Sequence, residues 1–328
     1  MDHLKPFEPA YLGLLQSGEL AERARLAREA LKDCGLCARY CHVNRLEGVR
    51  GAVCRTGEKA QVSSFGPHHG EEAPLSGCNG SGTIFFTWCN MRCVFCQNFD
   101  ISWPGEGPGE GPGEGQGEGA KTGPEQLAAM MLALQRQGCH NINFVSPSHV
   151  VAQILEALVF AAEAGLSLPL VYNTGGFDSA EALKLLDGVI DIYMPDLKYG
   201  CTVRARKYSK IRGYAARNQA AVREMHRQVG DLILDEKGVA ERGLLVRHLV
   251  LPGGLAGSEE VMRFLAEEIS VNTYLNILSQ YRPCHRASGY PELRLRPSGR
   301  DFQEAFELAK RFGLNRLDER VPAFFSIF

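Results

Sequence analysis

The pattern of apolar and polar positions changes near residue 82. Beyond it, short continuous runs of apolar or β-branched residues alternate with segments whose apolar residues recur at helical spacing. Continuous apolar runs are typical of parallel strands that are covered on both faces. The runs predict six strands, at residues 82–88, 141–146, 168–174, 189–195, 244–251 and 273–280.

Helical patterns separate these six strands. They predict helices at residues 124–137, 149–164, 179–186, 215–229 and 259–269. Pro124 stands at a helix start, and Gly138 and Gly165 stand where helices end. Strands that alternate with helices predict a parallel α/β sheet, a (βα)6 unit that crossovers of one hand curl into a full or partial barrel. Periodicity leaves open whether this sheet closes.

The chain before this unit has a different character. Residues 12–32 carry apolar residues at helical spacing and predict a leading helix, and a cysteine-bearing segment with little strand pattern follows. We therefore divide the chain into an N-terminal helix and cysteine-rich region, residues 1–80, and a core domain, residues 81–328. Within the core, the tandem repeat PGEGPGEGPGEGQGEG at 104–119 has no apolar residues to bury, and we expect a flexible, acidic, solvated loop.

Composition narrows the setting of the protein. The chain has 328 residues, 45% of them hydrophobic, and a formal net charge of −2, which gives no general attraction to nucleic acid or to an anionic membrane. No apolar run approaches the ~20 residues that span a bilayer, and the N-terminus lacks the pattern of a secretory or transit signal. We therefore expect a cytoplasmic protein. Its 11 cysteines then indicate metal binding or chemistry rather than disulfides.

Three cysteines are concentrated directly after the first core strand. Cys89, Cys93 and Cys96 lie within eight residues, in the stretch GTIFFTWCNMRCVFCQN. A structural zinc site takes four ligands, whereas three thiolates on a cubane iron–sulfur cluster leave one iron without a protein ligand. The vacant iron is a place where a substrate or cofactor can bind. The three-cysteine loop therefore predicts a reactive cluster at the carboxyl edge of the sheet, where such folds gather their active residues.

This loop also carries a resemblance. The spacing C-x3-C-x-aromatic-C, with Phe95 as the aromatic residue, resembles the signature of the radical S-adenosylmethionine (radical SAM) superfamily. The surrounding sequence is similar to the pyruvate formate-lyase activating-enzyme group, and closest to its uncharacterised homologue branch. The likeness to that branch includes VYNTGG (171–176), YMPDLKY (193–199), EMHRQVG (224–230) and RHLVLPGG (247–254).

The resemblance implies a partial barrel and a radical reaction. A [4Fe–4S] cluster on the three cysteines would bind S-adenosylmethionine, and an electron from a low-potential donor such as flavodoxin or ferredoxin would cleave it to methionine and a 5′-deoxyadenosyl radical, which abstracts hydrogen from a substrate. The partner would be a glycyl radical enzyme if the chain is an activase. The alternatives are modification or epimerisation of a small molecule or peptide, and a non-catalytic iron–sulfur scaffold. No residue is assigned to the hydrogen abstraction itself.

The strand ends supply candidates for cofactor binding. After the second strand come Ser146, Ser148 and His149; the activating enzymes often have a Gly-Gly-Glu-like turn there, and FVSPSH replaces it, so either Ser146 or His149 is a candidate for the methionine amine. The third strand ends at Asn173 and Thr174. In MPDLKY, Asp196 and Lys198 match the Asp-x-Lys motif of the group, which implies contacts to the ribose and the carboxylate of the cofactor. Arg247 matches an arginine that precedes a Pro-Gly turn.

A second set of four cysteines lies in the N-terminal region. Cys34, Cys37, Cys41 and Cys54 have spacings that suit a closed zinc site or a second iron–sulfur cluster. Four ligands argue against an open catalytic position, and the residues leave the choice of metal open.

Overall fold

The fold is seen in a computed structural model that describes residues 7–105 and 119–318. Most of the Gly/Glu repeat, residues 106–118, lies outside the described residues, and so does the predicted loop that it forms.

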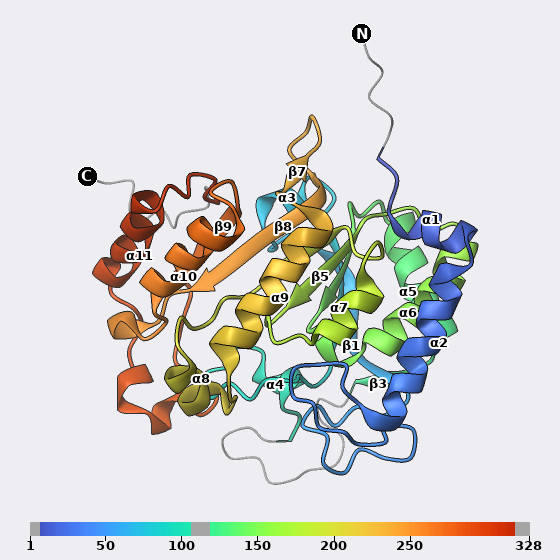
Figure 1. Cartoon of the computed structure of the whole chain (residues 1–328), viewed down its shortest axis with the longest axis horizontal. Helices are drawn as coiled ribbons and strands as arrows, with labels where there is room; N and C mark the ends of the chain where they lie inside the picture. Colours follow the sequence, from blue (N-terminus) through green and yellow to red (C-terminus); the bar gives the residue numbers. More distant parts are fainter. Residues whose placement is uncertain (1–6, 106–118, 319–328) are drawn as a thin grey trace.

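A curved sheet with six neighbouring parallel strands forms the centre of the molecule (Figure 1). All six pair in parallel, in the order of the chain, and each overlaps a predicted strand. Among the described residues β9 pairs with β8 and does not reach β2, so the sheet stays open. The predicted α/β fold is confirmed as an open, partial (βα)6 barrel. The six strands are β2 (Ser81–Phe86), β4 (Ile142–Val145), β5 (Leu170–Thr174), β6 (Ile192–Pro195), β8 (Ala240–Leu249) and β9 (Tyr274–Leu278).

Three further strands were not predicted. β1 (Ala60–His68) runs antiparallel to β2 and carries β3 (Ala120–Thr122) on its other side, and the short β7 (Ile233–Leu234) pairs antiparallel with β8. The sequence AQVSSFGPH of β1 has few apolar residues and includes Gly and Pro, so it lacks a strand pattern. β1 covers the edge of β2. It does so through backbone hydrogen bonds, which do not require an apolar face on β1.

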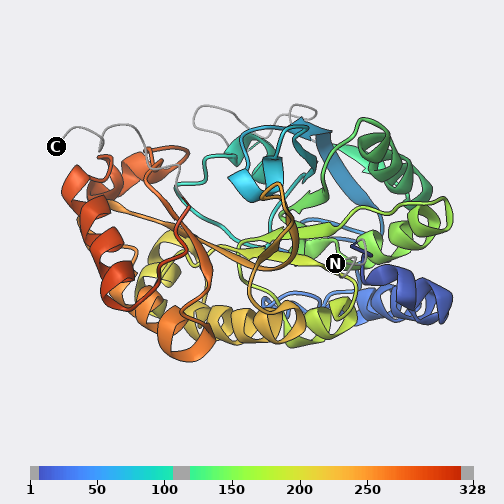
Figure 2. The ribbon, with the colours of Figure 1, turned by 90° about the horizontal axis from the view of Figure 1, so that it is seen from above.

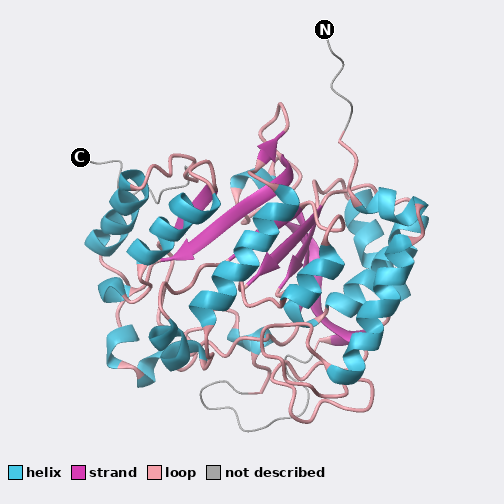
Figure 3. Ribbon diagram, in the orientation of Figure 1, coloured by secondary structure: helices cyan, strands magenta, loops and turns pink. Residues whose placement is uncertain are grey.

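Helices follow the outer side of the sheet, whereas α3 lies on the opposite side (Figures 2 and 3). The predicted leading helix is divided at Gly18, which has a φ of 79°. No described helix is long and apolar enough to cross a membrane. The helices that match predicted ones are α1 (Tyr11–Gln16), α2 (Glu19–Glu29), α5 (Pro124–Arg136), α6 (Val151–Glu163), α7 (Ala180–Leu186), α9 (Tyr214–Val229) and α10 (Ser258–Phe264); those not predicted are α3 (Ala73–Ser76), α4 (Phe99–Ser102), α8 (Thr202–Ser209) and α11 (Gly299–Arg311).

The short helix α3 fills the inside of the partial barrel. Its Leu75 is fully buried and packs in one cluster with Val171, Ile192 and Leu245 of the neighbouring strands. The Nδ2 of Asn141 donates a hydrogen bond to the Leu75 carbonyl at 2.9 Å and fixes the helix in place. The interior is therefore closed by apolar packing near the starts of the strands, and polar side chains are left to the opposite end.

The start of the chain is tied to loops that are synthesised much later. The backbone N–H of Ala10 donates to Oδ1 of Asp191 at 3.0 Å, and the Tyr11 hydroxyl donates to the Leu168 carbonyl at 3.1 Å. Asp191 also accepts a hydrogen bond from the Leu170 N–H at 3.2 Å, and its side chain is fully buried. One buried carboxyl group thus joins the N-terminal region to the loops before β5 and β6.

The buried His248 predicts an acid-sensitive step in stability. Its Nδ1 lies 2.7 Å from the Leu197 carbonyl and its Nε2 lies 2.9 Å from Oγ of Ser258, and burial lowers its pKa to about 4. Unfolded histidine titrates near 6.5, so between about pH 6.5 and 4 the unfolded chain binds more protons and acid favours unfolding. In urea unfolding, we expect the stability advantage of the native chain over His248→Gln to fall by about 1 kcal/mol per pH unit across this window. Parallel pH profiles of the two chains would contradict the prediction.

Candidate functional site

The carboxyl ends of the parallel strands surround a cavity of about 270 Å³. It is lined by nine of the residues predicted to hold the cluster and the cofactor, and by Thr174, but not by Ser148 or the alternative candidate His149. The nine are Cys89, Cys93, Phe95, Cys96, Ser146, Asn173, Asp196, Lys198 and Arg247. The rule that active residues gather at strand ends therefore brought together residues that are up to 158 positions apart, since Cys89 and Arg247 line the same cavity.

The three-cysteine loop follows β2 and is held by the end of α8. The N–H of Val94 donates to the Tyr208 carbonyl at 2.8 Å, and that of Arg92 donates to the Ser209 carbonyl at 3.2 Å. The Ser209 hydroxyl also donates to Sγ of Cys93 at 3.0 Å. The sequence analysis did not identify Ser209, because nothing in the local pattern relates α8 to the loop.

Burial sets the chemistry of the three thiols. It raises the pKa of Cys89 to about 12 and of Cys96 to about 11, and it raises that of Cys93 as well. The N–H of Met91 donates to Sγ of Cys89 at 3.4 Å, a contact that favours a thiolate. Without a cation these cysteines are neutral thiols at neutral pH, so a thiolate here needs a bound metal.

The aromatic residue of the motif packs beneath the loop. Phe95 is 3% exposed, and its ring meets those of Tyr199 and Tyr281 edge-on at centroid distances of 6.2 and 5.7 Å. It also lines the cavity. Phe95 thus joins the loop to a buried aromatic cluster while presenting apolar surface to the site.

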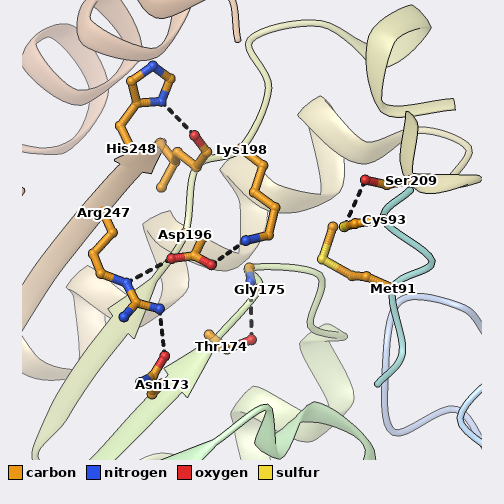
Figure 4. Close-up of polar contacts among 12 residues, drawn as sticks. Met91, Cys93, Asn173, Thr174, Gly175, Asp196, Lys198, Ser209, Arg247 and His248 are labelled. Atoms are coloured by element: carbon orange, nitrogen blue, oxygen red, sulfur yellow. Dashed lines mark hydrogen bonds and ion pairs between the residues drawn. The ribbon is translucent and has the colours of Figure 1, made fainter. Parts of the chain in front are cut away.

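Asp196 is the centre of the polar wall, between two cations (Figure 4). Its Oδ1 accepts from Nε of Arg247 at 2.8 Å, and its Oδ2 accepts from Nζ of Lys198. Nη2 of Arg247 continues to Oδ1 of Asn173 at 2.7 Å. Burial alone would raise the pKa of Asp196, but the two cations outweigh it and hold that pKa below its usual value. Asp196 in turn raises the pKa of Lys198, so the wall is charged at neutral pH.

A glycine pair allows three segments to meet at this wall. Gly176, after β5, has a φ of +71°, and a Cβ there would lie 2.1 Å from Nδ2 of Asn218 and 2.6 Å from the Asp196 carbonyl. A Cβ at Gly175 would lie 2.5 Å from Sδ of Met91. Only glycine lets the end of β5 approach both the three-cysteine loop and the end of β6 this closely.

The residues after β4 divide into one that faces the cavity and two that do not. Ser146 lines the cavity and has a left-handed backbone, with a φ of 60°. Ser148 hydrogen-bonds with Thr174 at 2.9 Å, in a buried network. The Nε2 of His149 lies 3.0 Å from the Thr87 carbonyl, and burial lowers the pKa of this ring to about 3. Of the two alternatives that the sequence left for the methionine amine, only Ser146 lies at the site.

A buried arginine lies beside the four-cysteine set. Arg45 is 2% exposed; its Nη1 donates to Sγ of Cys34 at 3.5 Å and its Nη2 to the His149 carbonyl at 2.8 Å. A hydrogen bond from Cys41, aided by the charge of Arg45, lowers the pKa of Cys34 to about 5, although burial opposes this. Burial raises the pKa of Cys37 to about 12. The positive charge of Arg45 therefore favours a thiolate in this set.

Asn90 lies between the two cysteine sets. Its side chain hydrogen-bonds Cys37, and its Oδ1 lies 3.9 Å from Sγ of Cys89. Nε of Arg39 donates to the Asn90 carbonyl at 2.7 Å, and the charges of Cys37 and Cys89 both act on this arginine. The two sets are therefore neighbours in space. No sequence pattern predicts this contact, which joins residues that are 51 positions apart.

Within the described ranges, 7–105 and 119–318, no group of three or more His, Cys, Asp or Glu side chains is arranged to hold a single metal ion. Four thiolates around one zinc ion at about 2.3 Å have sulfurs only about 4 Å apart, whereas a cubane takes each thiolate on a different iron. Cys89, Cys93 and Cys96 line one cavity, so each could hold a different iron of a cluster there.

The chain was compared with protein-family models, with solved structures and with known sequences. No protein-family model matches the chain. The crystal structure of a radical SAM methyltransferase from Sphaerobacter thermophilus is similar with a TM-score of 0.44 and 13% identity, over 71% of this chain and 64% of that one. The structure of HydG, a maturase of the [FeFe]-hydrogenase, is similar with a TM-score of 0.47 and 12% identity, over 72% and 49%. The chain spans less than two thirds of either protein.

A sequence relative is more informative about kinship. The uncharacterized protein MJ0674 of Methanocaldococcus jannaschii is 31% identical over 296 residues, which cover 89% of this chain and 79% of the relative. Since this identity extends over most of both chains, the protein belongs to the same family as MJ0674.

Proposed function

We propose that the chain is a radical SAM enzyme. One observation carries the proposal: three cysteines at the spacing C-x3-C-x2-C, one buried and two partly buried, face a cavity whose other wall is made of charged strand ends. Cys89, Cys93 and Cys96 would each hold one iron of a [4Fe–4S] cluster. When bound, the cluster and S-adenosylmethionine would supply reductive cleavage to methionine and a 5′-deoxyadenosyl radical that abstracts hydrogen from a substrate.

The chain's own residues would orient the cofactor and exclude water. Asp196 and Lys198 are proposed to bind the hydroxyl and carboxylate groups of S-adenosylmethionine, and Ser146 its amine. Arg247 holds Asp196 in position through a hydrogen bond of 2.8 Å, and Asn173 in turn accepts a hydrogen bond from Arg247 at 2.7 Å. Phe95 excludes water from the cluster side because it is buried among aromatic rings.

The direct test is cleavage of S-adenosylmethionine. The chain, reconstituted anaerobically with iron and sulfide and reduced with dithionite, is expected to release 5′-deoxyadenosine and methionine, detected by liquid chromatography. The matched control omits the reductant and is expected to release neither product. Failure with every low-potential donor tried would contradict the proposed function.

We further propose that the four-cysteine set holds a second metal group. Proximity supports this, because Asn90 contacts cysteines of both sets. Iron counting separates the two alternatives: about eight irons per chain indicate two clusters, whereas about four with one zinc indicate a zinc site. The division into residues 1–80 and 81–328 is kept as a proposal, with the addition that β1 of the first region extends the sheet of the second and α3 packs inside it.

An electron donor is the first partner that the proposal requires. The segment 204–217 is basic, and Arg206, Lys207 and Lys210 are exposed on it. It adjoins the three-cysteine loop through the hydrogen bonds of Tyr208 and Ser209. This charge supports a negatively charged low-potential protein, such as a flavodoxin or ferredoxin, as the donor.

Two reactions remain as candidates. Activation of a glycyl radical enzyme stays a prediction from the resemblance, and a gene for such an enzyme beside the gene of this chain would favour it. Direct modification of a small molecule or peptide is supported by a second cavity that adjoins the first. A non-catalytic scaffold would bind iron and release no 5′-deoxyadenosine.

A further inference from the structure

The second cavity lies inside the partial barrel, next to the proposed cofactor site. It has a volume of about 510 Å³, within the range of small-molecule sites. It shares wall residues with the first cavity, among them Asn173, Arg247 and Leu278. A ligand here would therefore lie against the same arginine that holds Asp196.

Two buried glutamates form the far end of this cavity. Glu71 and Glu72 precede α3 and are 8% and 4% exposed. Nδ2 of Asn276 on β9 donates to Oε1 of Glu72 at 3.0 Å. This hydrogen bond between Asn276 and Glu72 spans the open side of the sheet. Oε2 of Glu72 is buried and has no hydrogen-bond partner among the described residues. A buried carboxylate oxygen without a donor is costly, and it marks a position that a ligand donor would satisfy.

Around the two cavities there is one carboxylate more than there are lysine and arginine side chains. Asp196, Glu71 and Glu72 face Arg247 and Lys198, and Nδ1 of His68 lies 3.9 Å from Oε1 of Glu71. Nη1 of Arg247 lies 3.9 Å from Oε2 of Glu71 and 3.8 Å from Oε1 of Glu72, so its closer contact is with Asp196 at 2.8 Å. Burial raises the pKa of Glu71 to about 7, although Arg247 opposes this. Glu71 is therefore partly protonated near neutral pH, which reduces the excess negative charge at the glutamate end without removing it.

Apolar side chains form one part of the remaining wall, alongside polar residues such as Asn98 and Gln280. The apolar residues are Phe85 of β2, Val145 of β4, and Ile277 and Leu278 of β9. The glutamates suit a ligand group that is a positively charged hydrogen-bond donor. The apolar side chains suit a hydrocarbon part of the same ligand.

We propose that this cavity binds a small organic cation, with a primary amine or guanidinium on Glu71 and Glu72 and a hydrocarbon chain along Phe85 and Leu278. The inference rests on the proposed function and names its substrate class, since the chain of such a ligand points to the cofactor site. Glu71 and Glu72 do not line the first cavity, so this is a separate site from that of S-adenosylmethionine.

The test uses three probes of equal length on the reconstituted full chain. n-Pentylamine, 1-pentanol and pentanoate differ only in the charge of the head group, and ligand-observed NMR at 150 mM salt gives their dissociation constants. Pentylamine is expected to bind about tenfold or more tightly than the other two, because a buried charged hydrogen bond distinguishes it. Its affinity is expected to persist with S-adenosylmethionine present.

Variants locate the site. Glu72→Gln and Glu71→Gln are each expected to weaken pentylamine binding about tenfold, whereas Glu259→Gln, an exposed carboxylate paired with Arg311 at 2.9 Å, leaves it unchanged. Circular dichroism checks that each variant folds. If a variant does not fold, the comparison of the three probes on the native chain still tests the inference.

Several outcomes would overturn the inference. Equal binding of pentanoate would identify an anion site at Arg247, and displacement of pentylamine by S-adenosylmethionine would make the cavity part of the cofactor site. If a capped lysine tripeptide bound more tightly than pentylamine, the ligand would be a protein side chain rather than a small molecule. Because the binding test needs no turnover, release of 5′-deoxyadenosine without pentylamine binding refutes only this inference, and the reverse result refutes only the proposed function.

Discussion

Cys93→Ala is expected to abolish the release of 5′-deoxyadenosine and to remove about four irons from each chain, because a cubane cannot be held at this site by two thiolates. Cys93 is the best of the three to change. It is buried, it lines the cavity, and its sulfur accepts the Ser209 hydrogen bond at 3.0 Å. Iron analysis and product detection on the same sample give both results.

Two variants serve as controls for this experiment. Cys139→Ala removes a cysteine that is also buried, at 3% exposure, but belongs to neither set, and both iron and product should be unchanged. Cys37→Ala should remove only the metal of the four-cysteine set. If Cys93→Ala keeps its full iron content and still releases 5′-deoxyadenosine, the assignment of the three-cysteine loop is wrong.

The largest effect on stability is expected from Arg247→Met. The substitution keeps an unbranched apolar stem but leaves the carboxylates of Asp196, Glu71 and Glu72 without the cation that lies among them. Removing one partner of a buried ion pair costs about 3–5 kcal/mol. Urea unfolding at pH 8 should therefore show a loss of this size.

The pH dependence of this loss gives a second readout. Without Arg247, protonation relieves the stranded carboxylates in the folded state, so the loss should be smaller at pH 5 than at pH 8. Arg311→Met is the matched control, because Arg311 makes an exposed pair with Glu259, and it should cost less than about 1 kcal/mol at either pH. A loss at Arg247 no greater than at Arg311 would contradict the role given to it.

The sequence predicted the residues of the site better than it predicted the elements that cover the sheet, β1 and α3. Continuous apolar runs located six parallel strands, and the residues that follow them, such as Asp196, line one cavity. The predictions failed where a segment is held by distant partners. β1 is ordered by pairing with β2, and Leu75 of α3 by burial among three strands, and neither has a periodic pattern of its own.

The same reason explains which polar residues escaped notice. Glu72 was not predicted as part of any site because it stands in a Gly- and Pro-rich stretch, and its partner Asn276 is 204 positions away. Asn90 likewise matters because it lies beside the four-cysteine set. No pattern in the neighbouring sequence indicates that the two are close in space. Spacing identifies ligands that share one loop, whereas contacts between loops need the fold.

The bonds from Ala10 and Tyr11 to Asp191 and Leu168 have a consequence for biosynthesis. At about 5–20 residues per second, a ribosome needs roughly 10–35 s to add the 181 residues between Ala10 and Asp191. During this interval the cysteines at 34–54 have already been made, but the N-terminal segment beside them cannot yet dock. We therefore expect these thiols to be exposed to oxidants and to stray metals on the nascent chain, and to receive their metal only after β6 has been made.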